Sequence, residues 1–415
     1  MTLLYLATAA FFVALGVTAL LTPAIRSAAL RYGWTDRPDG VRKLHQSATP
    51  SIGGVAIFFG IALAVLLVVW AAPALGVPSV DLHPAVYIGA ILIAAMGAYD
   101  DLKNLGFKAK LAVEVVIAYA LLHAGYRVDL SGLPFVGESI YTEALYSIPL
   151  TLLWIVGVIN AVNLIDGVDG LAAGVVAIGF ASLAVAFGLL GDLPLVLVAV
   201  AVVGALVGFL VHNFNPATIF MGDSGSLLLG YGIAVYSLAG SADAVSPLAP
   251  LVPVIALGLP LLDTALSMYR RAAEKKSIYA PDHDHIHHRM VSRMPVRRAV
   301  LALYGVAAAF GAAAVAAAVS TSTGVAWAVL AAALVAALLL FRLGYVRLPY
   351  AAPRLVLSSV RTVTGADEET ATSPRTTRVS VRREDEISGD GANTEVPQDV
   401  ASGARESRFT PALSY

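Results

Sequence analysis

Residues 52–75 read IGGVAIFFGIALAVLLVVWAAPAL, and this run contains no charged side chain. A helix needs roughly 20 apolar residues to cross a hydrocarbon layer of ~30 Å, so the run is long enough to span a bilayer. Spanning segments must be helices or closed barrels, because unsatisfied backbone groups are costly in lipid. An unbroken apolar run is typical of a helix, whereas barrel strands alternate apolar and polar residues. The sequence therefore predicts a transmembrane helix here.

Ten further runs have the same character. The 415-residue chain is 58% hydrophobic and 13% charged, well outside the usual range of soluble domains. We therefore predict an all-α, polytopic integral membrane protein. Its eleven spans are expected at about 3–23, 52–75, 84–98, 109–125, 146–163, 171–190, 194–212, 226–240, 249–269, 299–319 and 325–343. No Lys or Arg precedes the first span, so we expect it to stay in the mature chain.

The basic residues indicate the orientation of the chain. Up to residue 341, sixteen Lys and Arg fall in loops or at span ends on one side, and only Arg127 falls on the other. The positive-inside rule predicts that the basic side is cytoplasmic, which puts the N-terminus outside and the C-terminus inside. The sixteen are Arg26, Arg31, Arg37, Arg42, Lys43, Lys103, Lys108, Lys110, Arg270, Arg271, Lys275, Lys276, Arg289, Arg293, Arg297 and Arg298.

Two parts are expected along the chain, a membrane domain at 1–345 and a cytoplasmic tail at 353–415. The tail is rich in Ser, Thr, Arg, Glu and Gly. Such a composition cannot bury enough apolar surface to order itself, so we predict that the tail is disordered. The chain has no Cys, which excludes disulfides and thiolate metal sites.

Four polar strings interrupt the apolar chain: GAYDD at 97–101, NAVNLIDGVDGLAAG at 160–174, NPATIFMGDSGS at 215–226 and DHDHIHHR at 282–289. Under the predicted topology all four lie at the cytoplasmic side. Asp100 and Asp101 are adjacent carboxylates at a membrane edge, which repel each other unless a cation or a proton intervenes. They indicate metal or proton handling, and a helix end solvated by headgroups is the alternative.

Asn160, Asn163, Asp166 and Asp169 recur at steps of three. While the chain stays helical, this spacing predicts a polar stripe on one face of the helix. Carboxylate and amide oxygens suit a hard divalent cation such as Mg²⁺. The alternative is that buried amides join neighbouring helices.

Asp223 precedes Ser224-Gly225-Ser226 and an apolar run. This order predicts a helix N-terminus, whose free amides and dipole attract phosphate, and Gly225 would allow close approach of a ligand to the backbone. Together with the other strings it indicates one wall of a pyrophosphate site. Simple capping by the Asp223 or Ser224 side chain is the alternative.

The histidine string lies beside Lys275, Lys276 and Arg289, which favours an anionic ligand over a transition metal. We interpret its side chains as donors to phosphates, and a solvated loop is the alternative. In the first basic loop, Lys43 and His45 could contribute in the same way, or the loop could serve only to fix topology.

Taken together, RKLH, GAYDD, NAVNLIDGVDGLAAG, NPATIFMGDSGS and HDHIHHR occur in the order found in polyprenyl-phosphate N-acetylhexosamine-1-phosphate transferases, of the glycosyltransferase family 4 type. The chain resembles this family from about Arg42 to Arg289. The short HIHHR form is similar to the branch that uses UDP-N-acetylglucosamine. That branch carries Arg at the position of Ser51, so the sugar stays open.

The resemblance implies transfer of a sugar-1-phosphate from a UDP-sugar to polyprenyl phosphate in the cell membrane, with release of UMP. It implies Mg²⁺ as cofactor, with Mn²⁺ as an alternative ion, held by Asp223 and Asn163. Catalytic roles would fall to Asp100, Asp101 and Asp166. The expected substrate-binding residues are Lys43, His45, Asn160, Asp169, His285, His287, His288 and Arg289.

Other functions are weighed against this one. A UDP-muramyl-pentapeptide phosphotransferase would differ in the donor, and an ion-coupled transporter would use membrane carboxylates as an ion path. Transporter sites lie near the bilayer midplane, often between inverted repeats, whereas these carboxylates lie at helix ends and no repeat is visible. A lipid-binding scaffold would not explain the Asn and Asp spacing. We expect membrane lipid and a second copy of the chain as partners, and no nucleic acid.

Overall fold

The computed structural model describes residues 1–35, 49–78, 80–128, 143–240, 251–277, 285–320 and 322–344. By its contacts the chain divides into residues 1–351 and 352–415. The predicted tail at 353–415 lies outside the described residues, as do Lys43 and His45. Everything below concerns the first unit.

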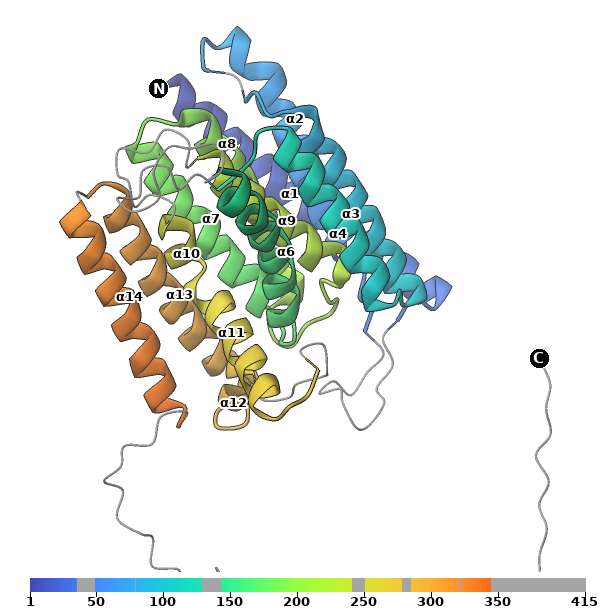
Figure 1. Cartoon of the computed structure of the whole chain (residues 1–415). Helices are drawn as coiled ribbons and strands as arrows, with labels where there is room; N and C mark the ends of the chain where they lie inside the picture. Colours follow the sequence, from blue (N-terminus) through green and yellow to red (C-terminus); the bar gives the residue numbers. More distant parts are fainter. Residues whose placement is uncertain are drawn as a thin grey trace, which may run out of the picture. The chain divides into compact units, whose positions relative to one another are not determined.

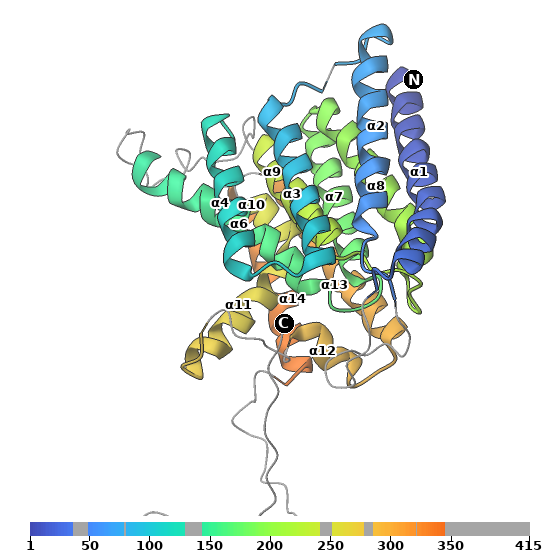
Figure 2. The same cartoon turned by 90° about the vertical axis from the view of Figure 1, so that its right-hand side faces the viewer.

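The described part is all-α, as predicted, and none of its residues forms a strand (Figures 1 and 2). The helices are α1 Thr2–Tyr32, α2 Gly54–Ala74, α3 Pro84–Lys103, α4 Phe107–His123, the π-helix η1 Glu143–Ser147, α6 Ile148–Ile165, α7 Leu171–Leu189, α8 Leu193–Asn213, α9 Asp223–Ala239, α10 Leu251–Ala256, α11 Gly258–Ala273, α12 Ile286–Val291, α13 Val296–Ala318 and α14 Ser322–Arg342. Each predicted apolar run coincides with helical residues, and all but the run at 249–269, described below, match one main helix. Among the described helices, eight spans are long and apolar enough to cross a membrane, so the chain is a polytopic membrane protein. Both the total of eleven and the orientation stay predictions.

Helix α9 lies at the centre of the bundle and packs against α2, α3, α6 and α7. At its N-terminal end the backbones approach so closely that side chains would not fit between them. A Cβ on Gly54 of α2 would lie 2.0 Å from the amide nitrogen of Gly225, and one on Gly97 of α3 would lie 2.4 Å from the carbonyl oxygen of Asp223. Gly225 therefore serves the contact between α2 and α9, where the sequence analysis expected it to make room for a ligand.

Helix α1 is longer than predicted. The expected span ends at Pro23, but the helix continues through this proline to Tyr32 and ends at Gly33. Proline has no N–H, so it leaves the carbonyl oxygen of Ala19 without its helical donor. The imidazole of His212, on α8, lies with Nε2 3.0 Å from that oxygen and supplies the missing hydrogen bond. The contact between α1 and α8 therefore stabilises the helix across its proline.

The span predicted at 249–269 is wrong as one continuous helix, because the structure has two helices there. Helix α10 ends at Ala256 and α11 begins at Gly258. Pro260 lacks the N–H that would bond to the carbonyl of Ala256, which explains the break. Helix α11 leads to the end of the bundle where α12 also lies (Figures 1 and 2).

The Gly54 contact gives a first test of the fold. Gly54→Ala is expected to lower the midpoint of thermal unfolding, because the added methyl group would overlap the α9 backbone, and overpacking of this kind costs about 1–3 kcal/mol. Gly16→Ala, in α1, is the matched control, since a Cβ there would meet nothing within 4 Å. Equal unfolding midpoints for the two variants would contradict the close packing of α2 on α9.

Candidate active site

The N-terminus of α9 is held by a carboxylate from another helix. Asp101, near the end of α3, accepts hydrogen bonds from the amides of Asp223 at 2.7 Å and Ser224 at 3.1 Å. Gly222 makes the turn into the helix with φ of 71°, a conformation that favours glycine, and a Cβ there would lie 1.8 Å from the carbonyl oxygen of Ser51. These two amides are therefore not free, and the prediction that they would bind phosphate is wrong. Neither capping alternative is correct, because Asp101 provides the cap.

Asp100 and Asp223 share one ammonium group. Nζ of Lys110, on α4, lies 3.1 Å from Oδ2 of Asp100 and 2.8 Å from Oδ2 of Asp223. The second oxygen of Asp223 accepts a hydrogen bond at 3.0 Å from the side-chain amide of Asn163, which also donates to Oγ of Ser226 at 2.9 Å. The structure thus brings Asp100, Asn163 and Asp223 together from three helices.

Lys110 and Glu114 belong to the site although the sequence analysis gave them no role in it. They lie one helical turn apart on α4, and the Asn160 amide donates a hydrogen bond of 2.6 Å to the buried Glu114 carboxylate. Asn160 therefore satisfies a buried charge in this structure. A signal for both residues was present, because charged side chains inside a predicted span usually mark a functional site.

The stripe predicted from Asn160 to Asp169 is interrupted, since α6 ends at Ile165. Asp166 lies just beyond the helix and is half-buried. Burial raises the pKa of its carboxyl well above the usual range, and neighbouring carboxylates, that of Asp223 first among them, raise it further. Such a carboxyl is stabilised in its charged form by a nearby cation.

Asp169 turns away from the stripe and anchors a loop. Its Oδ2 accepts hydrogen bonds from the Asn215 side chain at 2.9 Å and from the backbone amide of Ala217 at 3.0 Å. In this structure Asp169 therefore joins the turn after α6 to the loop before α9. Substrate binding by Asp169 stays a prediction.

Two substitutions of Asp169 distinguish a role in joining the two loops from a role in substrate binding. Asp169→Ala is expected to lower the unfolding midpoint, because hydrogen bonds to a charged group contribute about 1.5–3 kcal/mol each. Asp169→Asn keeps an acceptor oxygen for Ala217 and is expected to retain most of the wild-type midpoint and activity. Loss of activity in Asp169→Asn at an unchanged midpoint would instead indicate direct contact with substrate.

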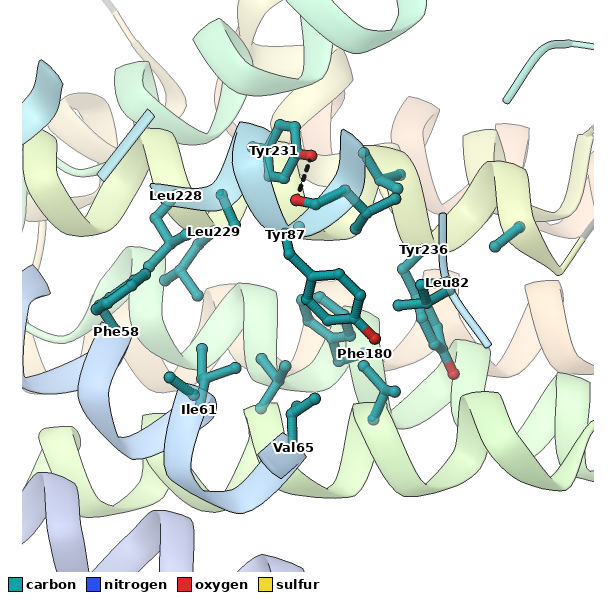
Figure 3. A pocket seen from close by; sticks show the side chains of 18 of the residues that line it. Phe58, Ile61, Val65, Leu82, Tyr87, Phe180, Leu228, Leu229, Tyr231 and Tyr236 are labelled. Atoms are coloured by element: carbon teal, nitrogen blue, oxygen red, sulfur yellow. Dashed lines mark hydrogen bonds between the residues drawn. The ribbon is translucent and has the colours of Figure 1, made fainter. Parts of the chain in front are cut away.

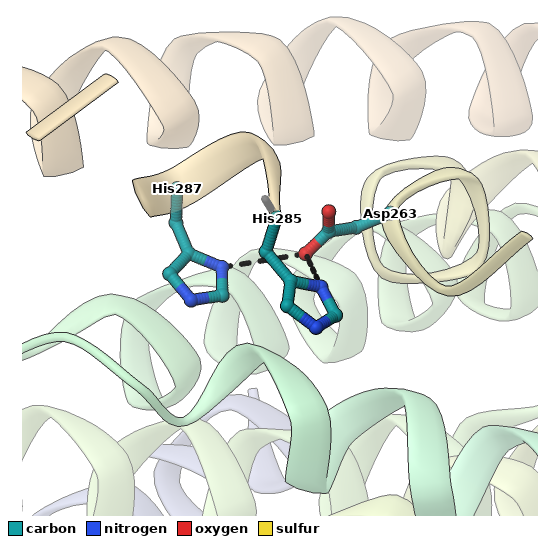
Figure 4. A group of neighbouring side chains, drawn as sticks. All are labelled: Asp263, His285 and His287. Atoms are coloured by element: carbon teal, nitrogen blue, oxygen red, sulfur yellow. Dashed lines mark hydrogen bonds and ion pairs between the residues drawn. The ribbon is translucent and has the colours of Figure 1, made fainter. Parts of the chain in front are cut away.

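The histidine string is organised by Asp263, a buried carboxylate on α11 (Figure 4). Nδ1 of His285 donates to its Oδ2 at 3.1 Å, Nδ1 of His287 lies 3.3 Å from the same oxygen, and the amide of Ile286 donates to Oδ1 at 2.7 Å. Asp263 also lies inside a predicted span, so the signal that marks Lys110 could have identified it.

The same histidines approach the turn after α6. A Cβ on Gly167 would lie 2.9 Å from Nε2 of His287, so only a glycine lets this imidazole rest against the turn beside Asp166. The His288 ring lies against those of His285 and His287, with centroids 6.1 Å and 4.3 Å away. Arg289 follows in the short helix α12. The histidine string and the Asn and Asp string therefore meet, although more than a hundred residues separate them.

Two groups of side chains could hold a cation. The first is the cluster of Asp223, Asp166 and Asn163, where oxygen donors suit Mg²⁺ and Lys110 already balances part of the negative charge. The second is Asp263 with His285 and His287, whose candidate ligand atoms all lie within 4.8 Å of one another. In the second group Nδ1 of His285 donates a hydrogen bond to the carboxylate and Nδ1 of His287 lies 3.3 Å from it, so both imidazoles direct Nδ1 at Asp263 (Figure 4). The first cluster is therefore the better fit for a hard ion.

Known proteins are similar to this chain in sequence. The sequence pattern of glycosyl transferase family 4 matches residues 83–241. A Bacillus subtilis (strain 168) protein named "Probable undecaprenyl-phosphate N-acetylglucosaminyl 1-phosphate transferase" is 38% identical over 307 residues, which are 74% of this chain and 83% of that relative. The chain belongs to glycosyl transferase family 4. The resemblance predicted from the motifs is confirmed.

Two other relatives have similar names. The "Decaprenyl-phosphate N-acetylglucosaminephosphotransferase" of Mycolicibacterium smegmatis is 37% identical over 72% of this chain and 79% of its own length. The "Undecaprenyl-phosphate alpha-N-acetylglucosaminyl 1-phosphate transferase" of Escherichia coli (strain K12) is 27% identical over 68% of this chain and 76% of its own length. The family pattern covers GAYDD, the Asn and Asp string and MGDSGS, whereas Asp263 and the histidine string lie beyond it.

Proposed function

We propose that this chain transfers N-acetylglucosamine-1-phosphate from UDP-N-acetylglucosamine to a polyprenyl phosphate and releases UMP. Such a transfer would begin the synthesis of a lipid-linked glycan of the cell envelope. One observation supports this proposal most directly. Lys110 binds both Asp100 and Asp223, and Asn163 donates to Asp223, within a chain 38% identical to a protein named for this reaction. The basic loops support a cytoplasmic location for the site.

The reaction requires two anionic substrates to approach each other. An oxygen of the lipid phosphate forms a bond to the sugar-bearing phosphorus of the donor, and the bond from that phosphorus to UMP breaks. Bound at Asp223, Asp166 and Asn163, Mg²⁺ would neutralise charge on the diphosphate and on the departing UMP. Lipid phosphate is already largely ionised near neutral pH, so the reaction does not need a strong base.

Cationic side chains of the protein would also reduce the repulsion between the two anionic substrates. His287, His288 and Arg289 are proposed to hold the donor phosphates, with Asp263 orienting the imidazole of His287 so that Nε2 faces the turn at Gly167. Lys110 lies between Asp100 and Asp223, and we propose that its ammonium group faces the acceptor phosphate. Asp101 positions the end of α9, and therefore Asp223, through its two amide hydrogen bonds.

An apolar groove supports a lipid acceptor. It has a volume of about 380 Å³, and residues of α6, α9, α10 and α11 line it, including Trp154, Leu261 and Thr264. Thr264 follows Asp263 directly in α11, but Asp263 itself does not line the groove. The buried hydroxyl of Thr264 has no hydrogen-bond partner among the described residues. We propose this groove as the place of the first isoprene units of the acceptor.

The proposal is tested by incubating the purified full chain with polyprenyl phosphate, Mg²⁺ and a panel of UDP-sugars, and by measuring UMP and the lipid product. UDP-N-acetylglucosamine is expected to give both products in equal amounts. Turnover with UDP-muramyl-pentapeptide alone would identify the other branch of donors. Release of no UMP with any donor, together with ion uptake into vesicles, would favour the transporter.

A further inference from the structure

A second apolar groove lies between α2 and α3 and has no part in the proposed reaction (Figure 3). It has a volume of about 520 Å³, within the ~300–1,000 Å³ range of ligand pockets. Its floor consists of residues of α8 and α9 together with Phe180 of α7. Leu66 and Ile91, on its two rims, are 62% and 54% exposed, so the groove opens sideways to the surrounding lipid.

The groove is closed off from the carboxylate cluster. It begins near Phe58 on α2 and Leu228 on α9. Between these residues and Asp223, the backbones of α2 and α9 touch at Gly54 and Gly225, and α3 joins them at Gly97. A lipid whose phosphate is held at the site therefore cannot pass its chain directly into this groove along α9.

The other end of the groove is polar. Figure 3 shows Tyr87 and Tyr236 together there, away from Phe58. Tyr236 is 4% exposed, and its hydroxyl has no hydrogen-bond partner among the described residues. A buried hydroxyl without a partner costs free energy unless a ligand or water supplies one. Its position on the groove wall points to a ligand with an acceptor oxygen.

A second cavity, of about 520 Å³, adjoins this end and shares Leu82, Leu195 and Ala239 with the groove. Its ionisable side chains are Asp81, His83, Tyr126 and Asp192. Among the described residues, neither cavity has a Lys or Arg in its lining. Nδ1 of His83 accepts a hydrogen bond from the amide of Ala85, so its Nε2 carries the proton and can donate. The combined lining is negative, with nearby donors.

We propose that the two cavities together bind a phospholipid whose headgroup carries a primary amine. An acyl chain would lie in the groove, the ammonium group would lie near Asp81 and Asp192, and the Tyr236 hydroxyl would donate to an ester oxygen. His83 would donate to the lipid phosphate. A lipid with a phosphate and no amine is disfavoured, because two carboxylates face its headgroup. This lipid site lies at the end of α3 opposite to Asp100 and Asp101.

The proposed preference for an amine headgroup can be tested by native mass spectrometry. The delipidated full chain is titrated with phosphatidylethanolamine or with phosphatidylglycerol. The wild type is expected to bind phosphatidylethanolamine about tenfold more tightly than phosphatidylglycerol. A difference of this size corresponds to roughly one charge-assisted contact. The double variant Asp81→Asn with Asp192→Asn should lose this preference, because it removes both carboxylates. It should stay folded, because asparagine at position 192 can still cap α8. Gly232→Leu should block binding of both lipids, because its side chain would enter the groove, where a Cβ would meet only Phe180 at 3.7 Å.

Ala265→Phe, in the groove proposed for the acceptor, is the matched control and should leave phosphatidylethanolamine binding unchanged. Thermal unfolding of each variant shows that it is folded. Equal affinities for the two lipids in the wild type, or an unchanged preference in the double variant, would overturn the charge argument. Two results together would overturn the proposal and assign the groove to the acceptor. Polyprenyl phosphate would displace phosphatidylethanolamine from the wild type, and Gly232→Leu would abolish the binding of polyprenyl phosphate.

Discussion

Asp223→Asn is expected to lower the rate of sugar-phosphate transfer by about 10²–10³-fold, the usual effect of removing one preorganised electrostatic group. The carboxylate lies 2.8 Å from the ammonium of Lys110 and 3.0 Å from the amide of Asn163. A neutral amide would lose the attraction to Lys110 and would bind a divalent ion less well. The Mg²⁺ concentration that gives half-maximal rate should therefore rise as well, which a titration of UMP release against Mg²⁺ measures.

Asp81→Asn is the matched control for this substitution. It makes the same chemical change at the opposite end of α3, in a residue that lines the cavity beside His83. We expect its rate and its Mg²⁺ requirement to equal those of the wild type. Thermal unfolding should show both variants folded. Near-normal turnover of Asp223→Asn at saturating Mg²⁺ would remove Asp223 from the proposed ion site.

Asp263→Asn is expected to lower kcat/KM for the UDP-sugar by about 10–100-fold, as substitutions of residues that orient a ligand-binding histidine commonly do. Asparagine can still accept from the Ile286 amide, but it cannot hold two imidazoles on one charged oxygen. His287 would then lose its fixed direction toward the turn at Gly167. Because the histidines are proposed to contact the donor, the KM for the UDP-sugar should change more than the KM for the lipid.

Tyr269→Phe, on the exposed side of the same helix, serves as the control. Initial rates with each substrate varied in turn separate the two KM values. A fall in unfolding midpoint with kcat/KM for the UDP-sugar within twofold of the wild type would show that Asp263 only stabilises the fold. The two kinetic experiments test different contacts, because Asp223 lies on α9 beside Lys110 whereas Asp263 lies on α11 beside the histidines.

The apolar runs were sufficient to predict the helices, because length and hydropathy decide what can cross lipid. They could not show where α1 ends or where the ninth run breaks. Pro23 and Pro260 look alike in sequence, yet the helix continues through Pro23 with the help of His212, whereas Pro260 follows a break between two helices. The difference depends on a partner from another part of the chain, which no local pattern reveals.

The candidate site was predicted in composition more than in arrangement. The motifs identified Asp100, Asp223 and Asn163, and the structure brings these together. The pairing of Asp101 with the α9 amides was missed, since a helix N-terminus in sequence gives no sign that a distant carboxylate already occupies it. Lys110, Glu114 and Asp263 could have been found by asking why charged residues occur inside predicted spans.

The bridge between Pro23 and His212 makes two distant positions depend on each other. Restoring an N–H at position 23 would let the helix satisfy Ala19 by itself, and the imidazole on α8 would then share its acceptor with that N–H. Replacing His212 alone would leave a carbonyl without a donor in a nonpolar environment. Substitutions at these two sites should therefore be non-additive, and evolutionary drift at either one should be constrained by the residue present at the other.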